Sequence, residues 1–111
     1  MEQRIRAIIQ RETGIDILEK NRRREYVELR SMYYTILKEL NPNYTAARIG
    51  KSVNKTREAV LYGLEYYQEI APKSLEKLKL LITEELNDDY LSEFLSTENR
   101  NEILKQIYEE L

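Results

Sequence analysis

The sequence predicts an all-α protein, and three observations lead to this prediction. Apolar residues recur at spacings of three and four along most of the chain, which is the period of a helix with one buried face. Only three Gly and two Pro interrupt the 111 residues. With 41% hydrophobic residues, the chain can also bury one core of ordinary size. We therefore expect a bundle of a few largely unbroken helices.

The first half of the chain predicts two of these helices. Ile5, Ile8 and Ile9 share one face of a helix over 2–12, which Gly14 can end in the left-handed conformation. Asp16 is expected to cap a short helical turn at 17–18. After the polar run 21–24, apolar residues predict a longer helix over 25–40, which stops before Pro42.

The next segment predicts a short helix, a turn and a longer helix. Thr45 is placed to cap a helix over 46–50, and Asn54 or Thr56 to cap a helix that reaches residue 70. This order is typical of a helix-turn-helix. The turn after Gly50 is longer than the usual three or four residues, so the spacing alone is a weak indication.

Residues 73–111 are expected to form an acidic helical extension to a domain over 1–72. Ser74 is placed to cap a helix that carries Leu75, Leu78, Ile82 and Leu86, and 87–89 is expected to break it before a short segment over 90–95. A terminal helix then places apolar residues on one face: Ile103, Leu104, Ile107, Tyr108 and Leu111. This face is expected to pack on the domain or to meet a second copy or a protein partner.

Composition excludes most catalytic and metal chemistry. The chain has no Cys and no His, so it lacks thiolate ligands, cysteine nucleophiles and the commonest general base. Its Gly residues at 14, 50 and 63 lie too far apart for a phosphate-binding loop. Acidic pairs such as 84–85 and 88–89 are expected to be solvated. We expect no enzyme activity, cofactor, metal or nucleotide, and no membrane span or signal peptide in a cytoplasmic protein.

Charge divides the chain into a basic and an acidic part. Residues 19–57 hold ten basic and four acidic residues, a net charge of +6, whereas 72–111 hold five basic and ten acidic residues, a net charge of −5. A basic segment beside an acidic tail indicates a part that binds a polyanion. Duplex DNA, with one charge about every 1.7 Å of its axis, is the expected partner.

Residues 15–70 resemble the C-terminal DNA-binding domain of the bacterial replication initiator DnaA, whose helical fold is shared with the Trp repressor. Three blocks carry the resemblance: the basic run over 22–30, the stretch 45–50, which is similar to the family's Ser-x-x-x-Ile-Gly, and Val60-Leu61. The resemblance implies a helix-turn-helix that binds DNA in replication or transcription control. Because no ATPase motif accompanies it, the chain looks like a free-standing version, as expected of a phage or mobile element.

The recognition helix departs from the family pattern. The family has Arg-Asp-His-(Thr or Ser)-Thr-Val where this chain has residues 55–60, with Arg57 in place of His and Ala59 in place of Thr. The DNA sequence read by the family is therefore not expected here. The family's Pro after the basic loop is absent, and Arg30 matches its DNA-contacting arginines only within one residue.

Ten residues form the expected DNA-binding site. Arg57 can donate two hydrogen bonds to guanine, and Thr56 is expected to contribute to base discrimination with it. Tyr62 occupies the place of a recognition-helix His in the family. The others are expected at phosphates or, for Arg30, a phosphate or the minor groove: Arg22, Arg23, Arg24, Arg30, Arg48, Lys51 and Lys55.

Several of these features also have a purely structural interpretation. Glu58 can accept from cytosine or simply interact with the helix dipole, and most of the nine Tyr are expected in the core rather than stacked on bases. As a whole, the chain can instead be a structural or protein-interaction component, such as a phage assembly protein, that keeps the fold without reading DNA sequence.

Overall fold

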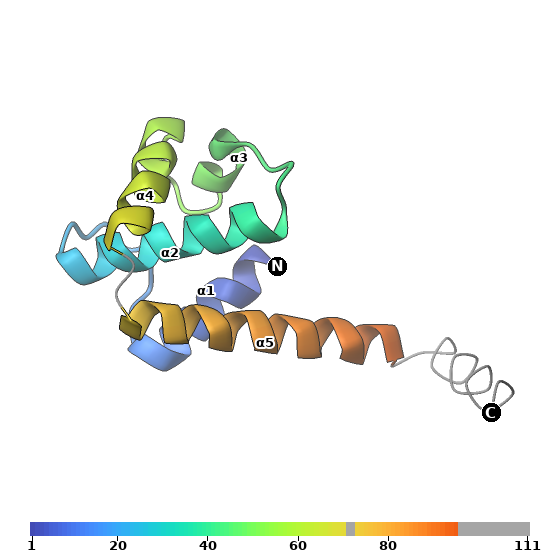
Figure 1. The fold of residues 1–111 in the computed structure, drawn as a ribbon. Helices are drawn as coiled ribbons and strands as arrows, with labels where there is room; N and C mark the ends of the chain where they lie inside the picture. The colour runs from blue at the N-terminus through green and yellow to red at the C-terminus, as the bar shows by residue number, and fades with distance from the viewer. Residues whose placement is uncertain (71–72, 96–111) are drawn as a thin grey trace, which may run out of the picture.

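A computed structural model describes residues 1–70 and 73–95 and shows five helices in them (Figure 1). These are α1 (Glu2–Thr13), α2 (Arg24–Leu40), α3 (Ala46–Lys51), α4 (Arg57–Ile70) and α5 (Lys73–Leu95). The predicted all-α class is confirmed for this part of the chain. The structure contains no strand within the described residues.

The second helix, α2, lies at the centre of the fold (Figure 1). It packs against α4 on one side and against α1 and α5 on the other. Every residue from Leu29 to Leu37 is buried, which requires neighbours around the whole circumference of the helix. Its Tyr33 hydroxyl lies 2.6 Å from the Ser52 hydroxyl and so ties α2 to the turn between α3 and α4.

Helix caps form at several of the predicted positions. Gly14 ends α1 with φ 74°, and its N–H donates to the carbonyl of Gln10. The Thr45 hydroxyl accepts from the Arg48 N–H at 3.1 Å, and the Thr56 hydroxyl accepts from the Ala59 N–H at 3.1 Å. Thr56 is therefore the cap of α4, whereas Asn54 lies in the turn with φ 57°.

The predicted capped turn at Asp16 forms: its side chain accepts from the Leu18 N–H at 2.9 Å, and residues 17–18 make a single turn that does not continue as a helix. One local prediction was wrong: α5 begins at Lys73, so Ser74 lies within the helix and not before it.

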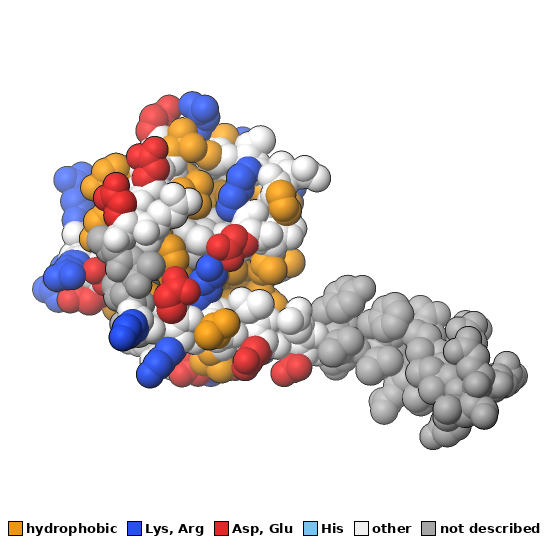
Figure 2. Space-filling model, in the orientation of Figure 1, with side chains coloured by type: hydrophobic (Ala, Val, Ile, Leu, Met, Phe, Trp, Pro, Cys, Tyr) orange, Lys and Arg blue, Asp and Glu red, His pale blue; other side chains and the backbone are white. Residues whose placement is uncertain are grey.

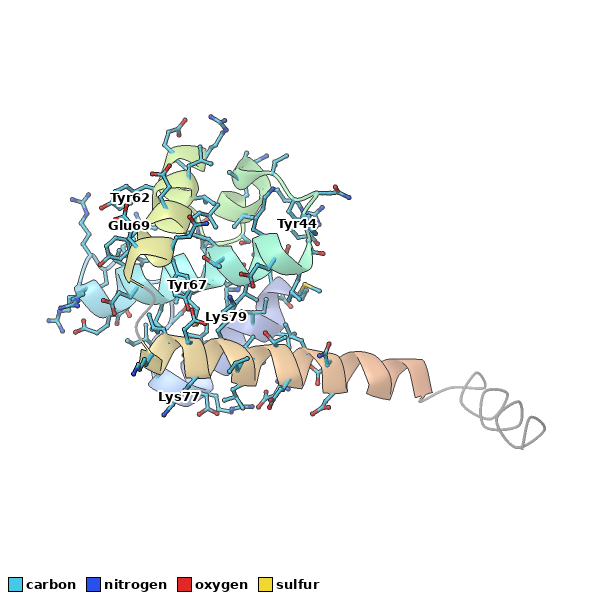
Figure 3. The ribbon with its side chains drawn as sticks, viewed as in Figure 1. Tyr44, Tyr62, Tyr67, Glu69, Lys77 and Lys79 are labelled. Carbon is cyan, nitrogen blue, oxygen red and sulfur yellow. The ribbon has the colours of Figure 1, made fainter. Side chains whose placement is uncertain are left out.

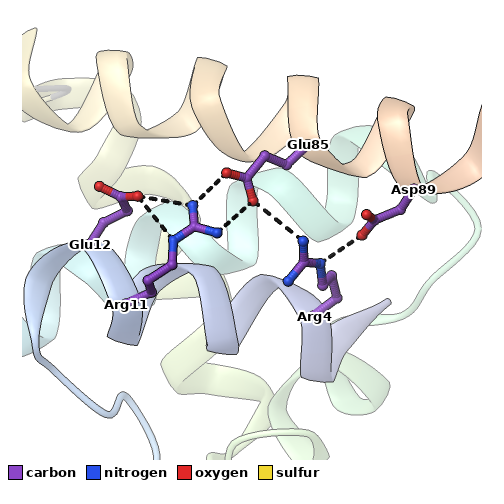
Figure 4. A network of polar contacts seen from close by, with 5 residues as sticks. All are labelled: Arg4, Arg11, Glu12, Glu85 and Asp89. Atoms are coloured by element: carbon purple, nitrogen blue, oxygen red, sulfur yellow. Dashed lines mark hydrogen bonds and ion pairs between the residues drawn. The ribbon is translucent and has the colours of Figure 1, made fainter.

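The predicted break at 87–89 was also wrong, since α5 continues through it to Leu95. Asn and Asp each cost at most about 0.7 kcal/mol relative to Ala inside a helix, so they do not end one that is held elsewhere. Ion pairs with α1 accompany this part of the helix: Asp89 pairs with Arg4 at 2.6 Å, and Glu85 pairs with Arg4 and Arg11 (Figure 4). Further along, the predicted terminal helix lies outside the described residues.

Candidate nucleic-acid interface

The α3–α4 unit presents the N-terminal end of α4 at the surface. Gly50 brings the two helices together, since a Cβ at this position would overlap the Lys55 carbonyl oxygen. The Lys55 N–H in turn donates to the Gly50 carbonyl at 2.8 Å. Val53 is buried beneath the turn, so the turn is packed onto the core. Thr56, the cap of α4, and Arg57, its first residue, remain exposed.

Arg30 is buried and does not reach the surface as a DNA ligand. Its side chain is only 5% exposed. Its guanidinium donates to the carbonyls of Ile17 at 2.9 Å, Asn21 at 2.8 Å and Glu19. A guanidinium has no acceptor and five donors, so three carbonyls on one loop use most of its capacity. The expected DNA contact of Arg30 is therefore corrected: this residue fixes the loop over 17–21 that leads into the basic run.

Three cations converge beside this loop: Lys20, Arg22 and Lys55, which we call the basic cleft. Two cavities open there, of about 240 and 220 Å³, and both are lined by Arg22 and Lys55. Lys20 lines the smaller cavity. Partial burial lowers the pKa of Lys55, and the nearby charges of Arg30, Arg22 and Lys20 lower it further. Because these like charges repel one another, an anion that binds between them is stabilised.

Lys20 and Arg22 join Lys55 because Arg30 folds the loop back toward the α3–α4 turn. Lys20 is not among the predicted site residues. Its position just before the basic run was the only available signal. No described carboxylate pairs with any of the three cations of the basic cleft.

The other predicted phosphate ligands are exposed but differ in their contacts. Arg23 is the N-cap residue of α2, and its N–H donates to the Asn21 side chain at 2.9 Å. Arg24 pairs with Glu28 at 2.8 Å, which offsets its charge. The Arg48 guanidinium lies 3.7 Å from the centre of the Tyr44 ring. Lys51 is the last residue of α3 and is exposed.

The exposed side of α4 is more acidic than the resemblance implies. Glu58, Glu65 and Glu69 are exposed and lie within about 40° around the helix. Tyr62 lies beside this stripe, 65% exposed and stacked on Tyr66 with ring centres 6.0 Å apart. Figure 3 shows Tyr62 and Glu69 on the same side of α4, and Figure 2 shows acidic side chains over this helix.

Arg57 points away from Tyr62, because five residues turn a helix by about 140° from one side chain to the other. The two predicted ligands on α4 therefore do not share one face. Arg57 belongs to the N-terminal end of the helix, whereas Tyr62 lies beside the larger cavity of the basic cleft. Carboxylates along the outer face of α4 repel phosphates, so the helix end and the basic cleft are the surfaces most favourable for DNA.

A scan against protein-family models found no match, and searches of curated proteins and of solved structures found no similar protein. None of the described helices is long and apolar enough to cross a membrane. Within residues 1–70 and 73–95, no three acidic side chains are grouped so that they could hold a metal ion.

Proposed function

We propose that this chain is a non-catalytic protein that binds duplex DNA through a helix-turn-helix made by α3 and α4. In this proposal the basic cleft and the exposed cations Arg23 and Lys51 contact the backbone. Arg57, at the exposed start of α4, reaches base edges. The resemblance to the DnaA C-terminal domain supports this role and extends it to replication or transcription control.

The observation that carries the proposal is the convergence of Lys20, Arg22 and Lys55 without a described acidic partner. Unpaired cations in one place release counterions when they meet a polyanion, and this release supplies most non-specific affinity for DNA. Fixing the loop by Arg30 lowers the entropy that binding would otherwise cost.

Fluorescence anisotropy with a labelled random duplex tests the proposal. The double variant Arg22→Gln/Lys55→Gln is expected to bind more weakly. The negative slope of log K against log salt should become shallower by about 1.8, because each lost phosphate contact removes about 0.9. The matched control Lys73→Gln/Lys77→Gln removes the same charge from exposed positions on α5. Equal losses in both double variants, or no binding at low salt, would contradict the proposal.

The acidic stripe of α4 favours a second candidate function, a protein-interaction component. Glu58, Glu65 and Glu69, together with the exposed Leu61, form a surface suited to a basic protein. Substituting the three glutamates with Gln separates the two functions. DNA binding is expected to strengthen in this variant if α4 approaches DNA, whereas binding to a basic partner is expected to weaken.

A further inference from the structure

The larger cavity of the basic cleft has features that backbone binding does not explain. It lies between α2 and α4, with Val27 and Tyr34 on one side and Ala59, Tyr62 and Gly63 on the other. Its volume is about 240 Å³, just below the range of about 300–1,000 Å³ that is typical of small-molecule sites. A cavity of this size suits a small ligand, such as one ring with an attached group.

Tyr34 supplies a hydrogen-bond donor at this cavity. The residue is only 3% exposed and lines the cavity, yet its hydroxyl has no hydrogen-bond partner among the described residues. The neighbouring buried tyrosines do have partners: Tyr33 meets Ser52 at 2.6 Å, and Tyr67 donates to Glu76 at 2.9 Å. Because no described residue accepts from this hydroxyl, it remains able to donate to an acceptor on a ligand.

Gly63 allows Tyr34 to occupy this place. A Cβ on Gly63 would lie 2.7 Å from Cδ2 of the Tyr34 ring, closer than packed carbon atoms approach. The missing side chain thus lets the ring lie against α4. The phenol is held by its neighbours before any ligand arrives.

The rim of the cavity combines charge with an aromatic surface. Arg22 and Lys55 supply two cations, which match a phosphate monoester with its charge of about −1.5 to −2 better than a carboxylate. The Tyr62 ring is 65% exposed at the same cavity and offers a flat face for stacking. The two cations, the stacking surface and the Tyr34 hydroxyl together match a ligand that has a phosphate and a ring.

We propose that this cavity binds a nucleoside monophosphate. The phosphate lies at Arg22 and Lys55, the base stacks on Tyr62, and the Tyr34 hydroxyl donates to an acceptor of the ring or sugar. A free mononucleotide fits better than a unit of duplex DNA, whose phosphodiester carries one charge and whose base is stacked inside. The sequence-based expectation of no nucleotide rested on the absent phosphate-binding loop, which concerns a different kind of site. The inference goes beyond DNA binding and does not depend on it.

The test is a titration of the ¹⁵N-labelled protein with thymidine 5′-monophosphate, followed by amide NMR shifts. We expect saturable shifts at Ala59 and Gly63, with weaker binding of thymidine and of inorganic phosphate, each of which lacks one half of the ligand. Tyr34→Phe is expected to weaken binding about fivefold, the effect of one hydrogen bond. Lys55→Gln is expected to weaken it tenfold or more, because its contact is charge-assisted. Lys77→Gln, an exposed charge change on α5, is the control.

Tyr34→Phe should unfold at the wild-type temperature, because the hydroxyl has no described partner to lose. A weaker affinity in this variant therefore reports binding and not misfolding. The proposal would be overturned by shifts that leave Ala59 and Gly63 unmoved, by equal affinity for inorganic phosphate and the nucleotide, or by an unchanged affinity in Tyr34→Phe. DNA anisotropy on the same samples keeps this result separate from the proposed function.

Discussion

Arg30→Met removes the group that fixes the basic loop while keeping a long apolar side chain in its place. The guanidinium of Arg30 donates to three carbonyls, those of Ile17, Glu19 and Asn21. Hydrogen bonds from a charged donor contribute about 1.5–3 kcal/mol each, which gives a gross loss of about 4.5–9 kcal/mol. Hydration of the freed carbonyls in this surface loop and the absence of a buried charge offset about half of this loss. We expect the free energy of unfolding to fall by about 2–4 kcal/mol.

Urea unfolding followed by circular dichroism at 222 nm measures this change. The matched control is Arg24→Met, whose side chain is 80% exposed and makes one pair with Glu28. That variant is expected to lose less than about 0.5 kcal/mol. DNA affinity of Arg30→Met should also fall, by about tenfold, because binding must then order the loop. A stability within 0.5 kcal/mol of the wild type would refute the anchoring role of Arg30.

Three further predictions follow from local contacts. Gly50→Ala forces a Cβ against the Lys55 carbonyl, and we expect a loss of about 1–3 kcal/mol in urea unfolding; unchanged stability would contradict this close approach. Arg11 holds the pKa of Glu85 below 4.5, so this pairing stabilises the fold above pH 4.5 and is lost as the pH falls further. The melting temperature of Glu85→Gln should therefore depend less on pH between pH 5 and 3 than that of the wild type. The same pH dependence in both proteins would count against this role of the pair. Burial raises the pKa of Tyr34 to about 12, so the contribution of its neutral phenol to stability is present below pH 10 and declines above it. Titration of the phenol absorbance at 295 nm should show a tyrosine with this raised pKa in the wild type but not in Tyr34→Phe. A wild-type titration without such a tyrosine would disprove the burial.

Much of the fold followed from periodicity and caps. Ile5, Ile8 and Ile9 are buried as predicted, and Gly14 and Thr45 end or begin their helices through the expected hydrogen bonds. These features depend on residues close in sequence. The break predicted at 87–89 rested on local propensity alone, which cannot report tertiary contacts of α5 such as the pairing of Asp89 with Arg4, 85 residues away.

The site was predictable in composition but not in geometry. The basic run correctly marked a surface rich in cations, but nothing in the sequence separates the buried Arg30 from the exposed Arg24 six residues earlier. Which of them turns inward is decided by carbonyls of a preceding loop. Likewise, the Tyr34 ring reaches its place beside α4 because Gly63 lies opposite it, which is a tertiary relation.

Amide NMR mapping with a short duplex tests the central claim, DNA binding at the basic cleft and the start of α4, most directly. We predict shifts at residues 20–24 and 54–58 that diminish as salt is raised, with α5 unaffected. Shifts confined to the acidic stripe of α4 or to α5, or no shifts at low salt, would contradict the account.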